Sequence, residues 1–268
     1  MPESSLPTLE LVAHVHRYER CLAYFASALH LFPPATCRVV ATIFYAVDDR
    51  PVNAVLDALC DSRPGSPQPP PPNVAWNLQS LAPRLLCRRA IGRNRAALAS
   101  RADWVLFVDI DYIPRHQALD HTLTALEQAN TGGLRLCYPQ QVMASSDHAA
   151  GDCELQRLDG ALAAALAGRS DSLGRVDIDE SLYSPKRLPA AIGGAQWVPG
   201  DVARRYGYLP DHPEFQQGAE TWQRTREDPV YRQYLWEQAG IGQQPLSVDG
   251  WYRIRHGLRG REDLGCRN

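Results

Sequence analysis

The first half of the chain alternates short apolar runs with stretches of helical periodicity. Runs rich in Val, Ile, Leu and Phe, typical of buried strands, lie at residues 10–15, 38–47, 74–78, 104–108 and 134–138. Between them, apolar spacing predicts helices over 22–29, 51–59 and 119–126, and an arginine-rich helix over 88–100. This alternation predicts an α/β domain with a mostly parallel central sheet flanked by helices.

The pattern is weaker in the second half. Four leucines at helical spacing predict one helix that ends at Gly168, and they are Leu155, Leu158, Leu162 and Leu166. Residues 169–190 are polar and have no clear period. Residues 192–198 predict a further strand, and residues 231–239 predict a last helix that ends at Gly240.

One proline-rich segment interrupts the pattern. Residues 62–72 contain six prolines, which neither a helix nor a central strand tolerates, so we expect a surface loop there. The same strand–helix alternation continues after it. A chain of 268 residues with 44% apolar composition can bury one substantial core, and we therefore expect a single domain over 1–268.

Charge and cysteine usage narrow the functional classes. A net charge of -2 gives no basic field for nucleic acid or an anionic membrane surface. The seven cysteines are scattered and odd in number, which favours reduced thiols over a disulfide framework. With no visible secretory signal and no apolar stretch of about 18 residues, we expect a cytoplasmic protein without a transmembrane segment.

The most informative polar pair follows the apolar run at 104–108. Asp109 and Asp111 flank Ile110, so on an extended strand both carboxylates would point the same way. Carboxylates at a strand end suit Mn²⁺ or Mg²⁺, which proteins usually hold with one or two carboxylates plus substrate phosphates. The alternative is a pair of solvated acids in a turn.

The segment around this pair resembles a known family signature. The residues are Gly-Arg-Asn-Arg-Ala-Ala at 92–97 and Ala-Asp-Trp-Val-Leu-Phe-Val-Asp-Ile-Asp at 102–111. They are similar to the inverting GT-A glycosyltransferases of the family-2 type, in which a helix that opens with Ala-Arg-Asn leads to a strand ending in Asp-x-Asp. Val-Asp-Asp at 47–49, the turn at 206–211 and Glu-Asp at 227–228 fit the same family. The resemblance covers roughly residues 9–257.

The resemblance implies a single Rossmann-like GT-A domain and a hexosyltransferase-like activity. Residues 1–130 would form the nucleotide-binding half and residues 131–268 the acceptor-binding, catalytic half. The donor would be a nucleoside diphosphate sugar, bound with Mn²⁺ or Mg²⁺. The acceptor would be a hydroxyl group of a sugar, a lipid-linked molecule or another compound.

Several residues would bind the donor. Asp48 and Asp49 match the acid pair that binds base and ribose, although Asp also suits the N-cap of the helix at Pro51. Arg93 would lie near the diphosphate or base, with a solvated helix face as the alternative. Asp109 belongs to the donor site and to the metal site. Tyr18, with Arg20, matches part of the turn that contacts the nucleotide.

The remaining roles concern the base and the metal shell. The family's catalytic base corresponds to Asp228, for which Asp228-Pro229 also predicts a helix N-cap. Glu220 is a rival base. His256 corresponds to a histidine that completes the metal shell in some family members. His14 and His16 could form a separate metal site on the first strand, which we consider the weaker alternative.

Two other functions fit part of the sequence. A nucleotidyltransferase also combines a nucleotide, a metal ion and paired acids. It would require a glycine-rich phosphate-binding loop after the first strand, where this chain has His-Arg-Tyr-Glu at 16–19. A catalytically silent binding module of the same fold is the other alternative.

Overall fold

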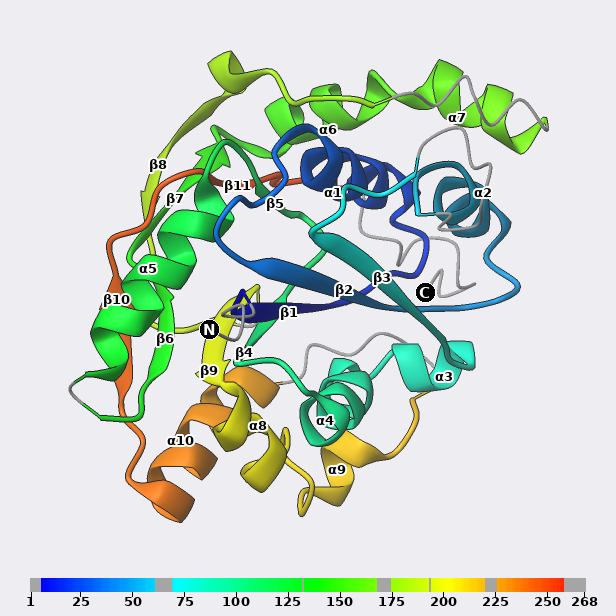
Figure 1. Ribbon diagram of the computed structural model, residues 1–268. Coiled ribbons are helices and arrows are strands. Elements are labelled where there is room, and N and C mark those ends of the chain that lie inside the picture. The colour runs from blue at the N-terminus through cyan, green and yellow to red at the C-terminus, as the bar shows by residue number, and fades with distance from the viewer. Residues whose placement is uncertain are drawn as a thin grey trace.

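The computed structural model describes residues 6–60, 69–131, 133–167, 175–192, 194–219 and 226–257. Within these residues, the central sheet has seven strands. The strand order is β10-β6-β9-β4-β1-β2-β3 (Figure 1). All neighbours pair in parallel except β9, which is antiparallel to β4 and β6. The predicted mostly parallel α/β sheet is therefore confirmed. The strands are β1 (Thr8–His14), β2 (Arg38–Tyr45), β3 (Val74–Ser80), β4 (Trp104–Val108), β6 (Leu136–Pro139), β9 (Ala195–Pro199) and β10 (Gln243–Leu246).

Helices cover both faces of this sheet (Figure 1). On one face lie α1 (Glu19–Leu31), α2 (Arg50–Leu59), α6 (His148–Gln156) and α7 (Asp159–Leu166). The opposite face carries α3 (Pro83–Leu86), α4 (Arg89–Ala99), α8 (Gly200–Tyr206), α9 (Pro213–Gln216) and α10 (Glu227–Ala239). Helix α5 (Ala118–Asn130) packs against β10. None of the helices described is long and apolar enough to cross a membrane.

A second sheet of four strands lies beside the first, and the sequence pattern does not predict it. Its order is β5-β11-β7-β8, with β5 (Tyr112–Pro114), β11 (Trp251–Arg253), β7 (Gln141–Ser145) and β8 (Tyr183–Arg187). These strands have three to five residues, too few for a hydrophobic period to stand out. The antiparallel pair β5–β11 joins the residues after Asp111 to those before His256.

The predicted helix over the four leucines is wrong in extent. The chain forms two helices there, α6 and α7, with a break at residues 157 and 158. Asp147 caps α6 by accepting from the Ala150 N–H, at 2.8 Å, so that helix begins well before Leu155. A short 3-10 helix (Glu180–Leu182) lies in the segment that showed no period. Residues 62–68, most of the predicted proline loop over 62–72, lie outside the described residues.

Candidate active site

The carboxyl ends of β1, β2 and β4 meet at one edge of the central sheet. These strands are parallel neighbours, with His14 opposite Phe44 and Val12 opposite Phe107. All five residues of β4 are buried, which fixes where the chain leaves the sheet. The polar segments after each strand are therefore brought together, as ligand sites in open α/β sheets are.

The Asp109–Asp111 segment is a turn at this edge. Strand β4 ends at Val108, and the Tyr112 N–H donates to the Asp109 carbonyl oxygen at 3.0 Å. The expectation of an extended strand with parallel carboxylates is therefore wrong. Because the chain turns at Ile110, the two carboxylates have different partners.

Asp109 lies in a network of part-buried ion pairs centred on the fully buried Arg93. Its Oδ1 accepts from Arg89 and, at 3.1 Å, from Nη2 of Arg93. Nη1 of Arg93 donates to Asp228 Oδ1 at 3.3 Å and to the Tyr208 hydroxyl at 3.0 Å. The Arg93 side chain has no solvent exposure, so its alternative as a solvated helix face is wrong. One guanidinium thus joins the Asp-x-Asp turn to Asp228.

This network sets the charge state of Asp109. Burial opposes ionisation of the carboxyl group, but the guanidinium groups of Arg89 and Arg93 outweigh burial and lower the pKa of Asp109. For Arg89, burial is likewise outweighed by Asp109 and Glu227, so its pKa is raised. Asp109 is a carboxylate held by two cations.

Asp111 has a different environment. Burial raises the pKa of its carboxyl group and the charge of Asp109 adds to that effect, against the opposing influence of Arg253 and His256. Arg253 Nε lies 3.4 Å from Asp111 Oδ2, and the Ile254 N–H donates to the Asp111 carbonyl oxygen at 2.9 Å. The His256 ring packs edge-on against Tyr18, with ring centroids 5.2 Å apart. The segment after β11 therefore runs beside Asp111 and brings His256 against Tyr18.

Asp111 and His256 provide part of the ligand set that a divalent cation needs. No group of three or more His, Cys, Asp or Glu side chains suited to a metal occurs among the described residues. A complete protein cage is thus not formed there. A part-buried carboxylate at Asp111 beside the His256 imidazole does fit an ion whose other ligands are phosphate oxygens, the usual arrangement for Mg²⁺ and related ions.

The acid pair after β2 divides into two roles. Asp49 is buried and caps α2 by accepting from the Val52 N–H at 3.4 Å. Its other oxygen accepts from the Arg17 N–H at 2.6 Å and lies 3.5 Å from His16 Nδ1. Asp48 is exposed at the same edge. The N-cap alternative is confirmed for Asp49, and Asp48 is the acid open to a ligand.

Asp228 does not cap its helix, contrary to the sequence-based expectation. Helix α10 begins at Glu227, its N-cap is Arg226, and no side chain caps it. Proline fits any position of a first turn, because those N–H groups have no intrahelical partner, so Asp-Pro alone does not locate the cap. The Asp228 carboxylate instead binds Arg93 and, at 3.2 Å, the Tyr208 hydroxyl.

Three site residues were missed in the sequence, namely Arg89, Tyr208 and Arg253. Arg89 also binds Glu227 Oε1 at 3.0 Å. Tyr208 follows Gly207, whose φ of 62° suits glycine, and its N–H donates to Asn94 Oδ1 at 2.9 Å. The Gly-Tyr turn was the one signal for Tyr208 in the sequence. Glu220, the rival base, lies outside the described residues.

Comparison of the sequence with family models and with curated proteins finds no match. The fold matches solved structures. One is the mannosyltransferase PcManGT from Pyrobaculum calidifontis in complex with GDP-Man and Mn²⁺, with a TM-score of 0.53 and 11% identity over 96% of this chain and 59% of that one. Another is S. aureus TarS, with a TM-score of 0.53 and 9% identity over 92% of this chain and 36% of that one. This chain spans less than two thirds of either protein, and what it shares with them is the α/β fold.

Proposed function

We propose that this protein is a glycosyltransferase that moves a sugar from a nucleoside diphosphate sugar to an acceptor hydroxyl, with a divalent metal ion and inversion at the anomeric carbon. The observation that carries the proposal is the Arg93 bridge, which ties the Asp-x-Asp turn to Asp228 within one part-buried network. The likeness in fold to a mannosyltransferase solved with GDP-Man and Mn²⁺ supports the same class of donor.

The donor would lie along the carboxyl edge of the sheet. Asp48 would accept hydrogen bonds from the ribose or base, with Asp49 holding the loop by capping α2. Tyr18 lies on the side where Asp111 and His256 would hold the metal. A bound Mn²⁺ or Mg²⁺ would offset the charge that develops on the leaving diphosphate.

Asp228 would act as the base. Its Oδ1 is held by Arg93 and Tyr208, while Oδ2 has no hydrogen bond from the described residues. An acceptor hydroxyl donating to Oδ2 would pass its proton there as its oxygen forms the bond to the anomeric carbon. The bond to the diphosphate oxygen breaks in the same displacement and the electron pair leaves with the nucleoside diphosphate, which inverts the configuration.

The proposal is tested first at the metal. Asp111→Asn should abolish Mn²⁺-dependent binding of GDP or UDP in calorimetric titration, because the amide loses the charge that attracts a hard cation. Glu237→Gln is a matched control, since Glu237 is an exposed acid on α10 whose bond to Gln233 is local. An affinity for nucleoside diphosphate plus Mn²⁺ that is unchanged in Asp111→Asn would contradict the metal site.

A catalytically silent module is the second candidate, because Asp109 is already held by two arginines. Hydrolysis of a panel of nucleotide sugars, beginning with GDP-mannose, separates the two candidates. An enzyme should release nucleoside diphosphate in the presence of Mn²⁺. A silent module should bind a donor and leave it intact.

A further inference from the structure

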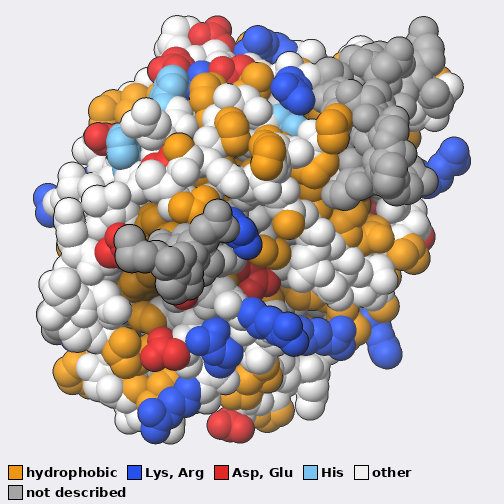
Figure 2. Space-filling view, viewed as in Figure 1, with side chains coloured by type: hydrophobic (Ala, Val, Ile, Leu, Met, Phe, Trp, Pro, Cys, Tyr) orange, Lys and Arg blue, Asp and Glu red, His pale blue; other side chains and the backbone are white. Residues whose placement is uncertain are grey.

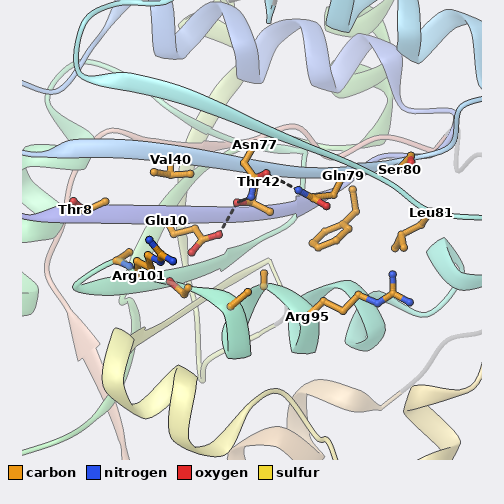
Figure 3. A pocket seen from close by; sticks show the side chains of 15 residues that line it. Thr8, Glu10, Val40, Thr42, Asn77, Gln79, Ser80, Leu81, Arg95 and Arg101 are labelled. Atoms are coloured by element: carbon orange, nitrogen blue, oxygen red, sulfur yellow. Dashed lines mark hydrogen bonds between the residues drawn. The ribbon is translucent and has the colours of Figure 1, made fainter.

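A cavity of about 410 Å³, lined by both polar and apolar side chains, lies between the central sheet and α4. The strand side, which we call the floor and which is uppermost in Figure 3, is formed by the first half of β1 and by β2 and β3, and the helix side, or roof, by the C-terminal half of α4. It reaches Thr8, at the start of β1, and Arg101, just beyond α4. Along β2 and β3 the cavity extends as far as Phe44 and Leu81, but β1 contributes only its first half, away from the Asp109–Asp111 turn. Its volume is within the range of about 300–1,000 Å³ found for small-molecule sites.

A directed chain of hydrogen bonds crosses the floor of the cavity. The Gln79 amide donates to Asn77 at 2.6 Å, Asn77 donates to the Thr42 hydroxyl at 3.1 Å, and Thr42 donates to Glu10 Oε1 at 2.5 Å. The chain ends on a carboxylate, whose Oε2 accepts no hydrogen bond from the described residues. Glu10 is only 6% exposed. A buried acceptor is therefore held in a fixed orientation at the floor.

The cavity exists because α4 presents small side chains to polar ones. Ala96 and Ala99 line the roof where larger apolar residues would fill the space between helix and sheet. Burying a carboxylate on a sheet face under a helix costs free energy unless hydrogen bonds compensate for it, and here Glu10 has one. Residues that oppose packing in this way mark a site rather than a core.

Two cations lie at opposite ends of the cavity. Arg101 lies beside Glu10, and Arg95 lies toward Leu81 at the other end of the cavity (Figure 3). Basic side chains gather over α4 on the face shown in Figure 2. Both arginines are exposed, and neither forms an ion pair or a side-chain hydrogen bond with the described residues. Guanidinium groups bind carboxylates and phosphates through paired N–H donors.

We propose that this cavity is a second ligand site, which binds an acidic sugar, meaning a monosaccharide with one carboxylate or phosphate group. Sugar hydroxyls would donate to Glu10 and exchange hydrogen bonds with Asn77 and Gln79. The anionic group would bind Arg95 or Arg101. A neutral sugar leaves both cations unsatisfied, and a small anion leaves the polar floor unsatisfied.

The test is calorimetric titration in EDTA, which removes metal-dependent binding. The probes are glucuronic acid, glucose 6-phosphate, glucose and inorganic phosphate. We expect at least one acidic sugar to bind about tenfold or more tightly than both glucose and phosphate, and which one binds identifies the anionic group. Arg95→Met/Arg101→Met should lose that preference, whereas Arg38→Met, an exposed arginine outside the cavity, should keep it.

Two further variants locate the binding. Ala96→Leu should fill the cavity and abolish binding of the acidic sugar, with circular dichroism to verify folding. Asp111→Asn should leave binding unchanged. Loss of binding in Asp111→Asn, retention of the preference in Arg95→Met/Arg101→Met, or glucose or phosphate binding as tightly as the acidic sugars would each overturn the proposal.

Discussion

The two ends of α4 hold charge in opposite ways. At its N-terminal end, the part-buried Arg89 and the fully buried Arg93 pair with Asp109, Glu227 and Asp228, so each of these two cations has an anionic partner. At its C-terminal end, Arg95 is exposed over a cavity, without an ion pair to the described residues. A buried network of paired charges fixes geometry before a ligand arrives, whereas unpaired cations at a cavity leave their binding capacity for the ligand.

The difference is already present in the helix register. Residues 89 and 93 are four apart and lie on one helix face, directed at the Asp-x-Asp turn and α10. Arg95 is two positions from Arg93 and so lies on another face. One helix therefore carries both the preorganised ion pairs of Arg89 and Arg93 and the unpaired Arg95 at the cavity.

The largest effect is expected from Asp228→Asn. The amide keeps an oxygen that can accept from Arg93 and Tyr208, but it cannot take a proton at neutral pH. Turnover should fall by roughly 10²–10⁴-fold, with donor affinity largely kept. Steady-state assays and donor titration measure the two effects, with Glu237→Gln as the control. Near-normal turnover would place the base elsewhere and make Glu220→Gln the next variant.

The comparison itself is tested by two arginine substitutions on α4. Arg93→Met should lower the free energy of unfolding by about 3–5 kcal/mol, because a fully buried cation is lost, Asp228 loses its ion pair and Asp109 keeps only Arg89. Arg95→Met removes the same charge from an exposed position at the cavity and should change the free energy of unfolding by about 0.5 kcal/mol or less. Urea denaturation gives both values. Equal losses of unfolding free energy in the two variants would refute the distinction between paired arginines at one end of α4 and an unpaired arginine at the cavity.

The sequence predicted the parts of this arrangement that depend on local pattern. An apolar run placed Asp109 at the end of β4, and Pro51 after an acid pair placed a cap that Asp49 provides. Helix α4 was expected at 88–100 and is found at Arg89–Ala99. Strands and caps are set by neighbours a few residues away, and such neighbours can be read directly from the chain.

The parts that depend on tertiary contacts were not predictable. Arg89 and Glu227 are 138 positions apart, and Arg253 and Asp111 are 142 apart, so only the folded topology pairs them. Strand β11, which brings Arg253 to the site, has three residues and no detectable period. The cavity depends on Glu10, Thr42 and Asn77, which lie on three strands and show their relation only when the sheet has formed.

The last prediction concerns Gly92, which lies between Arg89 and Arg93 on α4. Beneath it, His14 stacks on Phe44 with ring centroids 4.9 Å apart, and neither ring nitrogen of His14 has a hydrogen-bond partner among the described residues. A Cβ at Gly92 would overlap His14 Nε2 and lie 2.9 Å from Phe44 Cδ2. Glycine is therefore required for α4 to pack this closely against β1.

Gly92→Ala should destabilise the protein by about 1–3 kcal/mol, although alanine favours a helix, because the overlap forces α4 away from the sheet. His14→Ala removes the side chain that the new methyl group would meet. Gly92→Ala should therefore cost less in a His14→Ala background, with a coupling energy of about 0.5–3 kcal/mol between the two changes in urea denaturation. Strictly additive losses would show that His14 does not determine how closely α4 approaches β1, and that other contacts determine it.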